Sequence, residues 1–191
     1  DAKSPYELYR TVLDGFKKKL DGTAPNLTPY FAVEGGAVIG HNSDLLYNLK
    51  EDGVKYLTLT WNGENRIAGG SKTEKGLTRF GREVIKKLNS LKICCDLSHL
   101  NDKSFFAAIE QAEYPIASHS NCRAVCDVKR NLTDEQLKLI AQRNGIIGLC
   151  FYTKFLGGDT VERLYENICH MAELGLEDNI AVGSDFDGAE T

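Results

Sequence analysis

Residues 93–121 read ICCDLSHLNDKSFFAAIEQAEYPIASHSN, two short apolar runs separated by a segment with helical character. The first run closes on His99 and the second on His119. Four to six apolar or small residues between polar turn signals predict a strand that is buried on both faces. Between the runs, Asn101 can cap a helix, and Pro115 prevents that helix from continuing. The stretch therefore predicts a strand–helix–strand unit with a histidine at the end of each of two neighbouring parallel strands.

The same alternation extends over the rest of the chain. Helices are expected at 5–20, 44–51, 77–91, 133–143 and 160–174, and further strands at 30–33, 55–61, 145–152 and 179–186. Six strands that alternate with helices predict a parallel sheet with right-handed crossovers. The polar residues 62–76, which include four glycines, are expected to form a long loop of the kind that is usually functional or mobile.

The predicted fold class is α/β, as either a TIM-like (β/α)8 barrel or a doubly wound sheet. A complete barrel needs eight strand–helix units and about 250 residues. Six units are recognisable in the 191 residues of this chain. We therefore expect a single domain over residues 1–191 that forms an incomplete barrel.

The residues expected to close the six strands are chemically rich: Glu34, Trp61, His99, His119, Tyr152 and Asp185. In parallel α/β folds, ligands and catalytic groups gather at the carboxyl ends of the strands. One carboxylate and two imidazoles, from Glu34, His99 and His119, suit a divalent metal of the zinc type and leave room for water. A lone histidine at a strand end is usually a structural residue, but two on successive strands with carboxylates nearby favour a metal site.

Two further residues are candidates for substrate contacts. Asp185 in the DFDG segment is suited to proton transfer or to binding a substrate amine. Asp187, which precedes a glycine, is better explained as a turn residue. Arg130 could bind a carboxylate through two parallel hydrogen bonds, although an arginine in this position is more often a surface charge.

Composition excludes several classes of function. The formal net charge of −4 and the absence of Lys/Arg runs argue against nucleic-acid binding. No apolar run approaches about 18 residues, so no transmembrane helix is expected. Of the six cysteines, Cys94, Cys95, Cys150 and Cys169 fall inside predicted strands or helices, and no CxxC pair occurs, which predicts free, mostly buried thiols and a cytoplasmic location.

Taken in order, the segments VEGG, KYLTLTW, GLTRFGREVIKKLNSL, DLSH, SHSN, KRNLTDEQL and GSDFDG resemble the membrane (renal) dipeptidase family of zinc peptidases, the M19 type. The resemblance covers the chain from about Tyr30 onward. It implies a (β/α)8 metallo-dependent hydrolase barrel that holds two zinc ions and hydrolyses dipeptides. By motif, Glu34 corresponds to the glutamate that bridges the metals, and His99 and His119 to ligands of the second metal.

The resemblance also implies that Arg130 holds the substrate carboxylate and that Asp185 lies near the substrate amine. The chain departs from the family pattern in two places. It has no His-x-Asp pair, which in the family ligates the first metal from the first strand, so one half-site is complete. Trp61 stands where renal members have a histidine, and it is expected to line the substrate pocket.

The resemblance therefore predicts a zinc dipeptidase from which the first strand or strands and the C-terminal helical end are absent, and this truncated chain could be inactive. Two alternatives remain: another amidohydrolase-like activity such as a lactonase or deacylase, or a non-catalytic barrel fragment with a structural or binding role. The open strand edges of such a fragment predict an oligomer or a complementing fragment as partner.

Overall fold

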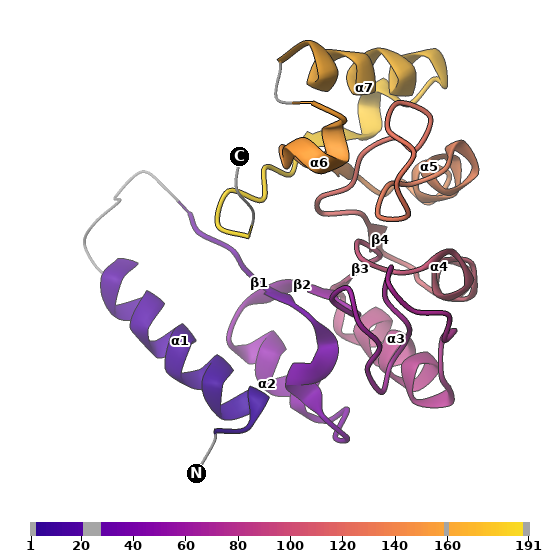
Figure 1. Ribbon diagram of the computed structural model, residues 1–191. Coiled ribbons are helices and arrows are strands. Elements are labelled where there is room, and N and C mark those ends of the chain that lie inside the picture. Colours follow the sequence, from indigo (N-terminus) through magenta and orange to yellow (C-terminus); the bar gives the residue numbers. More distant parts are fainter. Residues whose placement is uncertain (1–2, 21–27, 159–160, 189–191) are drawn as a thin grey trace.

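A computed structural model describes residues 3–20, 28–158 and 161–188 (Figure 1). The helices are α1 (Pro5–Leu20), α2 (Leu45–Glu51), α3 (Arg79–Leu91), α4 (Asp102–Ile109), α5 (Asp134–Ala141), α6 (Thr153–Leu156) and α7 (Val161–Glu173). The strands are β1 (Phe31–Glu34), β2 (Val54–Thr58), β3 (Cys94–Asp96), β4 (Pro115–Ile116), β5 (Ile147–Leu149) and β6 (Ile180–Val182). Two short 3-10 helices, η1 (Gly36–Ile39) and η2 (Glu177–Asn179), complete the described elements.

All strand pairs are parallel, as the alternation of strands and helices predicted. One sheet has the order β1-β2-β3-β4, and β5 pairs with β6 in a second. A parallel bridge between Ala117 and Ile147 connects the end of β4 to β5, so the six strands follow one another in sequence order. The α/β class with parallel sheets is therefore confirmed.

Local sequence signals explain where the helices begin. Thr78 and Asn101 accept hydrogen bonds from the backbone N–H groups of the first turns of α3 and α4. Thr133 and Gln136 form a complete capping box at the start of α5. Each side-chain oxygen satisfies an N–H group that has no partner inside the helix, which fixes the start of the helix.

Helix packing forms the core. α3 turns Val84, Ile85 and Leu88 toward the sheet, and all three are fully buried together with Leu57 of β2 and Phe105 of α4. In Figure 1 the helices that follow β2, β3 and β4 cover the outer side of these strands. The carboxyl ends of the strands are thereby left open to a common edge.

The strands are shorter than the sequence predicted. Apart from Glu34, which ends β1, each residue expected to close a strand lies three positions beyond the observed strand end: Trp61, His99, His119, Tyr152 and Asp185. After β2, for example, the side-chain amide of Asn65 donates to the carbonyl of Leu59 and its oxygen accepts from the N–H groups of Ile67 and Ala68. These bonds turn the chain out of the sheet after β2. The predicted ends of these five strands are wrong, and the five residues lie on loops.

Two glycines allow the strand ends to approach closely at the centre of the molecule. A Cβ atom on Gly148 or on Gly183 would lie 2.0 Å from the carbonyl oxygen of Ser118. No side chain fits at such a distance, so both positions require glycine. The close approach brings the loop after β4, which carries His119, against β5 and the end of β6.

The two outer strands, β1 and β6, each pair with one neighbour among the described residues. Large apolar side chains are exposed near both: Val12, Phe16 and Tyr30 near β1, and Val182 and Phe186 at β6.

No helix in the described part of the chain is long and apolar enough to cross a membrane. All six cysteines are free thiols, of which Cys95, Cys122 and Cys150 are buried and the other three partly buried.

Candidate metal centre

The loops after β3 and β4 bring two imidazoles against the carboxylate that ends β1. The Nε2 atoms of His99 and His119 lie 2.8 Å apart, and they lie 2.7 and 3.3 Å from Oε1 of Glu34. The imidazoles are buried, whereas the Glu34 side chain is 43% exposed. A tetrahedral zinc ion with bonds of about 2.0–2.1 Å holds its ligand atoms about 3.3 Å apart. The three donor atoms are therefore spaced for one cation of this size after a small expansion.

His99 reaches this position through an unusual backbone conformation. Its φ of 69° lies in the left-handed region, which non-glycine residues rarely adopt. The loop is held there because the N–H group of Ser71 donates to the carbonyl of His99 at 2.7 Å. The Nδ1 atom of His99 lies 3.0 Å from Oδ1 of Asn62, which also accepts a hydrogen bond from Ser71. The expected long loop at 62–76 thus contributes directly to the site.

His119 is held by two serines, Ser118 in the same loop after β4 and Ser98 in the loop after β3. Its N–H group donates to Oγ of Ser98 at 3.1 Å, and its Nδ1 atom lies 2.7 Å from Oγ of Ser118. Both contacts orient the ring so that Nε2 faces Glu34 and His99. Histidines that bind metals are commonly oriented in this way through their second ring nitrogen.

The electrostatics of the cluster favour a positive charge between the three side chains. The close contacts of its carboxylate with His119 and His99 keep the pKa of Glu34 well below its usual range, so the carboxylate is ionised. Burial lowers the pKa of His99, which favours its neutral form. Two imidazole nitrogens and a carboxylate oxygen, each able to donate a lone pair to a metal, lie within 4.8 Å of one another. The residues present therefore fit a divalent metal.

Arg130 lies beside this cluster and is buried, contrary to the usual exposure of such a residue. The residue is 6% exposed. Its guanidinium donates to Oγ of Ser120 and to the carbonyl of His119, both at 2.8 Å. The guanidinium also lies 5.6 Å from the centre of the Phe155 ring. No carboxylate pairs with it among the described residues, and its Nε atom has no hydrogen-bond partner. A buried, unpaired cation of this kind is suited to an anionic ligand.

One cavity of about 810 Å³ connects these groups: Glu34, His99, Arg130, Trp61 and Asp185 all line it. Asp185 has a φ of 61°, and its carboxylate lies 3.9 Å from Sγ of Cys150. The Trp61 side chain is 61% exposed, and its ring centroid lies 6.4 Å from that of His99. The structure thus brings every predicted site residue to one place, while their chemical roles stay predictions.

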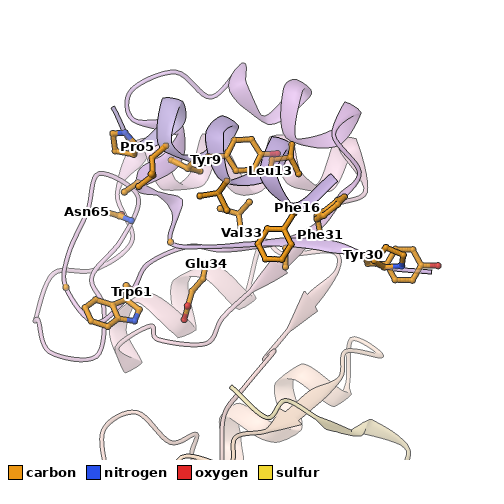
Figure 2. A pocket seen from close by; sticks show the side chains of 18 of the residues that line it. Pro5, Tyr9, Leu13, Phe16, Tyr30, Phe31, Val33, Glu34, Trp61 and Asn65 are labelled. Carbon is orange, nitrogen blue, oxygen red and sulfur yellow. The ribbon is translucent and has the colours of Figure 1, made fainter. Parts of the chain in front are cut away.

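A second cavity, of about 820 Å³, adjoins the first at Glu34 and Trp61. Figure 2 shows that it runs between α1 and β1, with Tyr9, Leu13 and Phe16 on the helix side. This groove is apolar apart from the end near Glu34, and it lacks a cluster of titratable groups. The first cavity is therefore the better candidate for chemistry.

Several polar residues of the site were not predicted from the sequence. They include Asn62, Asp96, Ser98, Ser118 and Ser120, which contact the histidines or Arg130, or each other. The available signal was their position: each lies within three residues of a predicted site residue on the same strand or loop.

Fold and site together define a parallel α/β protein with a candidate metal centre at the carboxyl edge of its strands. The family model for membrane dipeptidase (peptidase family M19) matches residues 17–191. The chain therefore belongs to this family, and the resemblance seen in the sequence motifs is confirmed.

Individual relatives agree with this assignment. An uncharacterised dipeptidase from Schizosaccharomyces pombe is 30% identical over 184 residues, covering 91% of this chain and 45% of its own length. The structure of a metallo peptidase from Rhodobacter sphaeroides, liganded with a phosphinate mimic of the dipeptide L-Ala-D-Ala, is 34% identical with a TM-score of 0.77, covering 84% of this chain and 50% of that one. An amidohydrolase from Pseudomonas aeruginosa shares the fold at 23% identity, with a TM-score of 0.89 over 97% of this chain and 65% of that one.

This chain spans about half the length of the curated relatives it matches, at 56%, 45% and 43% of the first three.

Proposed function

We propose that the protein hydrolyses dipeptides in a metal-dependent reaction, with zinc as the metal. The observation that carries this proposal is the convergence of Glu34, His99 and His119 beside the unpaired, buried guanidinium of Arg130 in one cavity. A free dipeptide offers a peptide carbonyl and a C-terminal carboxylate within a few ångströms of each other. These two groups match the metal cluster and the arginine.

The proposed division of labour follows from the positions of the side chains. Glu34, His99 and His119 would hold the metal, which supplies an activated water and stabilises negative charge on the carbonyl oxygen. Arg130 binds the C-terminal carboxylate and so orients the scissile bond relative to the cluster. Asp185, which lines the same cavity, binds the N-terminal amine of the substrate and passes a proton to the amine that leaves when the peptide bond breaks. Trp61 forms an exposed wall of the cavity and contacts the substrate side chain.

The family resemblance implied a second zinc ion. Among the described residues, Glu34, His99 and His119 form the one group of three possible ligands whose donor atoms lie close enough together to hold a metal ion. We therefore propose one complete set of ligands in this chain, with Glu34 free to bridge to a second ion because its side chain is partly exposed.

We also propose that the native fold is a (β/α)8 barrel, of which the six described strand–helix units form the larger part. The consecutive order of six parallel strands and the uncovered outer edges of β1 and β6 support this proposal. Two more units between these edges would close the barrel. Where the β1 and β6 edges of this chain are uncovered, we expect a complementing fragment or a second copy to pair with them.

Metal content tests the proposed site directly. Protein purified without chelators is analysed for zinc, and His99→Ala and His119→Ala are compared with wild type. We expect both variants to lose bound zinc, while His41→Ala, which alters a histidine outside the cluster, retains it. Unchanged zinc content in both cluster variants would show that the metal site is wrong.

Substrate class is tested on the zinc-loaded protein with a panel of dipeptides, N-acyl amino acids and lactones. Hydrolysis confined to dipeptides with free carboxylates is the expected result. Faster turnover of lactones or N-acyl amino acids would favour the other amidohydrolase-like activities, and zinc binding without turnover of any of them would favour a non-catalytic role.

A further inference from the structure

Asp96, at the end of β3, is a buried carboxylate that the proposed reaction does not use. It is fully buried and accepts hydrogen bonds from the N–H groups of Ser98 and Ser118 and from the hydroxyls of Thr58 and Ser118. No lysine, arginine or histidine is bonded to it among the described residues. A buried carboxylate needs such donors to be tolerated, and these four fill its acceptor sites.

The hydroxyl of Ser118 connects this carboxylate to the metal cluster. Its oxygen lies 2.6 Å from Oδ2 of Asp96 and 2.7 Å from Nδ1 of His119. A hydroxyl has one hydrogen to donate, and the Asp96 carboxylate already acts as an acceptor toward two N–H groups and the Thr58 hydroxyl. Ser118 therefore donates to Asp96 and accepts from His119, which requires a hydrogen on Nδ1 of the imidazole.

This direction of the hydrogen bonds decides which ring nitrogen is free. With the hydrogen on Nδ1, Nε2 of His119 carries a lone pair that faces Glu34 and His99. Asn62 has the same effect on His99. Its Oδ1 atom accepts a hydrogen bond from the Ser71 hydroxyl and, as an acceptor, can also accept one from Nδ1 of His99. Both histidines are thus set to present Nε2 to the same point.

We propose that Asp96 and Ser118 form a positioning relay that holds His119 with its hydrogen on Nδ1 and so presents Nε2 as a metal ligand. The inference rests on the proposed metal site and adds residues that act on the metal through His119. Neither Asp96 nor Ser118 touches the metal or the substrate. Partners of this kind fix the orientation of a ligating histidine and raise its basicity, and their loss typically weakens metal binding about 10- to 100-fold.

The main test compares Ser118→Ala with Ser118→Thr. The alanine variant removes the hydroxyl and breaks the relay, whereas threonine keeps it. Zinc dissociation constants are measured by competition with a chromophoric chelator, and Ser90→Ala serves as control because the Ser90 hydroxyl only donates within α3. We expect Ser118→Ala to bind zinc about 10- to 100-fold more weakly, while Ser118→Thr and Ser90→Ala stay close to wild type.

A second measurement does not depend on zinc. Nitrogen-15 NMR of the imidazoles in the metal-free protein shows which ring nitrogen of His119 carries the hydrogen. The relay requires Nδ1–H in wild type and a change toward the other form in Ser118→Ala. If His119 carries its hydrogen on Nε2 in metal-free wild-type protein, the relay is wrong even if Ser118→Ala fails to fold.

The outcomes separate this inference from the proposed function. If wild-type protein binds no zinc, the metal site is wrong and the NMR result alone decides whether the relay exists. If wild type binds zinc and His119→Ala loses it, but Ser118→Ala binds zinc as tightly as wild type, the metal site stands and the relay is overturned.

Discussion

Replacing Arg130 with lysine tests how the cavity recognises its substrate. The guanidinium uses one hydrogen of each terminal nitrogen on Ser120 and on the carbonyl of His119, which leaves a hydrogen on each and the unpaired Nε–H. Arginine can therefore make two bonds to a carboxylate while keeping both protein contacts. A lysine that keeps the same two contacts has one hydrogen left for the substrate.

The expected loss is one charge-assisted hydrogen bond. Such a bond contributes about 1.5–3 kcal/mol, and about 1.4 kcal/mol corresponds to a factor of ten. The preference for a dipeptide over its C-terminal amide, as a ratio of kcat/KM values, should therefore fall about 10- to 150-fold in Arg130→Lys. The ratio is the informative quantity because a general loss of structure lowers both rates together.

Zinc-loaded protein is assayed with a dipeptide and its amide, and binding of a phosphinate dipeptide mimic provides the same comparison without turnover. Arg123→Lys is the matched control, because Arg123 makes a similar two-pronged contact with Asp102 but lies outside the cavity. An Arg130→Lys protein with the same preference as wild type and Arg123→Lys would refute the assigned role.

Three further predictions concern the scaffold. Gly148→Ala should lower the free energy of unfolding by about 3 kcal/mol or more, measured by urea titration, because its Cβ would lie 2.0 Å from the Ser118 carbonyl; an unaffected midpoint would contradict this. Hydrogen bonds from Arg123 lower the pKa of Asp102, so this carboxylate stabilises the fold above its unfolded pKa of about 4, and the stabilisation is lost as the pH falls through the lower pKa of the folded state. Asp102→Asn should lower the free energy of unfolding at pH 7 by about 1 kcal/mol or less, because the pair is partly exposed, and the difference in Tm from wild type should shrink as the pH falls below about 4; a constant difference would argue against the ion pair. Finally, the uncovered edges of β1 and β6 predict an oligomer or a complex with a fragment that carries further strands, and light scattering that finds a lone monomer across a dilution series would disprove it.

Local sequence determined the elements and their order. The capping residues Thr133 and Asn101 start their helices where they were expected, because a cap acts on backbone groups within one turn. Alternation of strands and helices was sufficient to predict a parallel α/β fold, since parallel strands require crossover connections. The sequence also indicated Glu34, His99 and His119 as a group, because the ends of parallel strands share one edge.

Strand ends and side-chain environments became visible only in the structure. A turn made by Asn65 ends β2 earlier than its β-forming residues suggest, which places Trp61 on a loop. Arg130 looked like a surface charge in the sequence, yet the packing of Ser120 and Phe155 around it buries the guanidinium. Burial depends on residues far apart in the chain, so no local pattern can report it.

The contact between Ser118 and Asp96 makes the same distinction at atomic detail. The sequence places both near the predicted histidines, but it does not show that one hydroxyl lies between a buried carboxylate and an imidazole. That arrangement depends on the close approach of strand ends at Gly148 and Gly183, which sets the loop after β4 against β5. The sequence thus determined which residues gather at the edge, and the tertiary structure decided how they are hydrogen-bonded, because a hydrogen bond forms only between a donor and an acceptor that the fold brings within about 3 Å of each other.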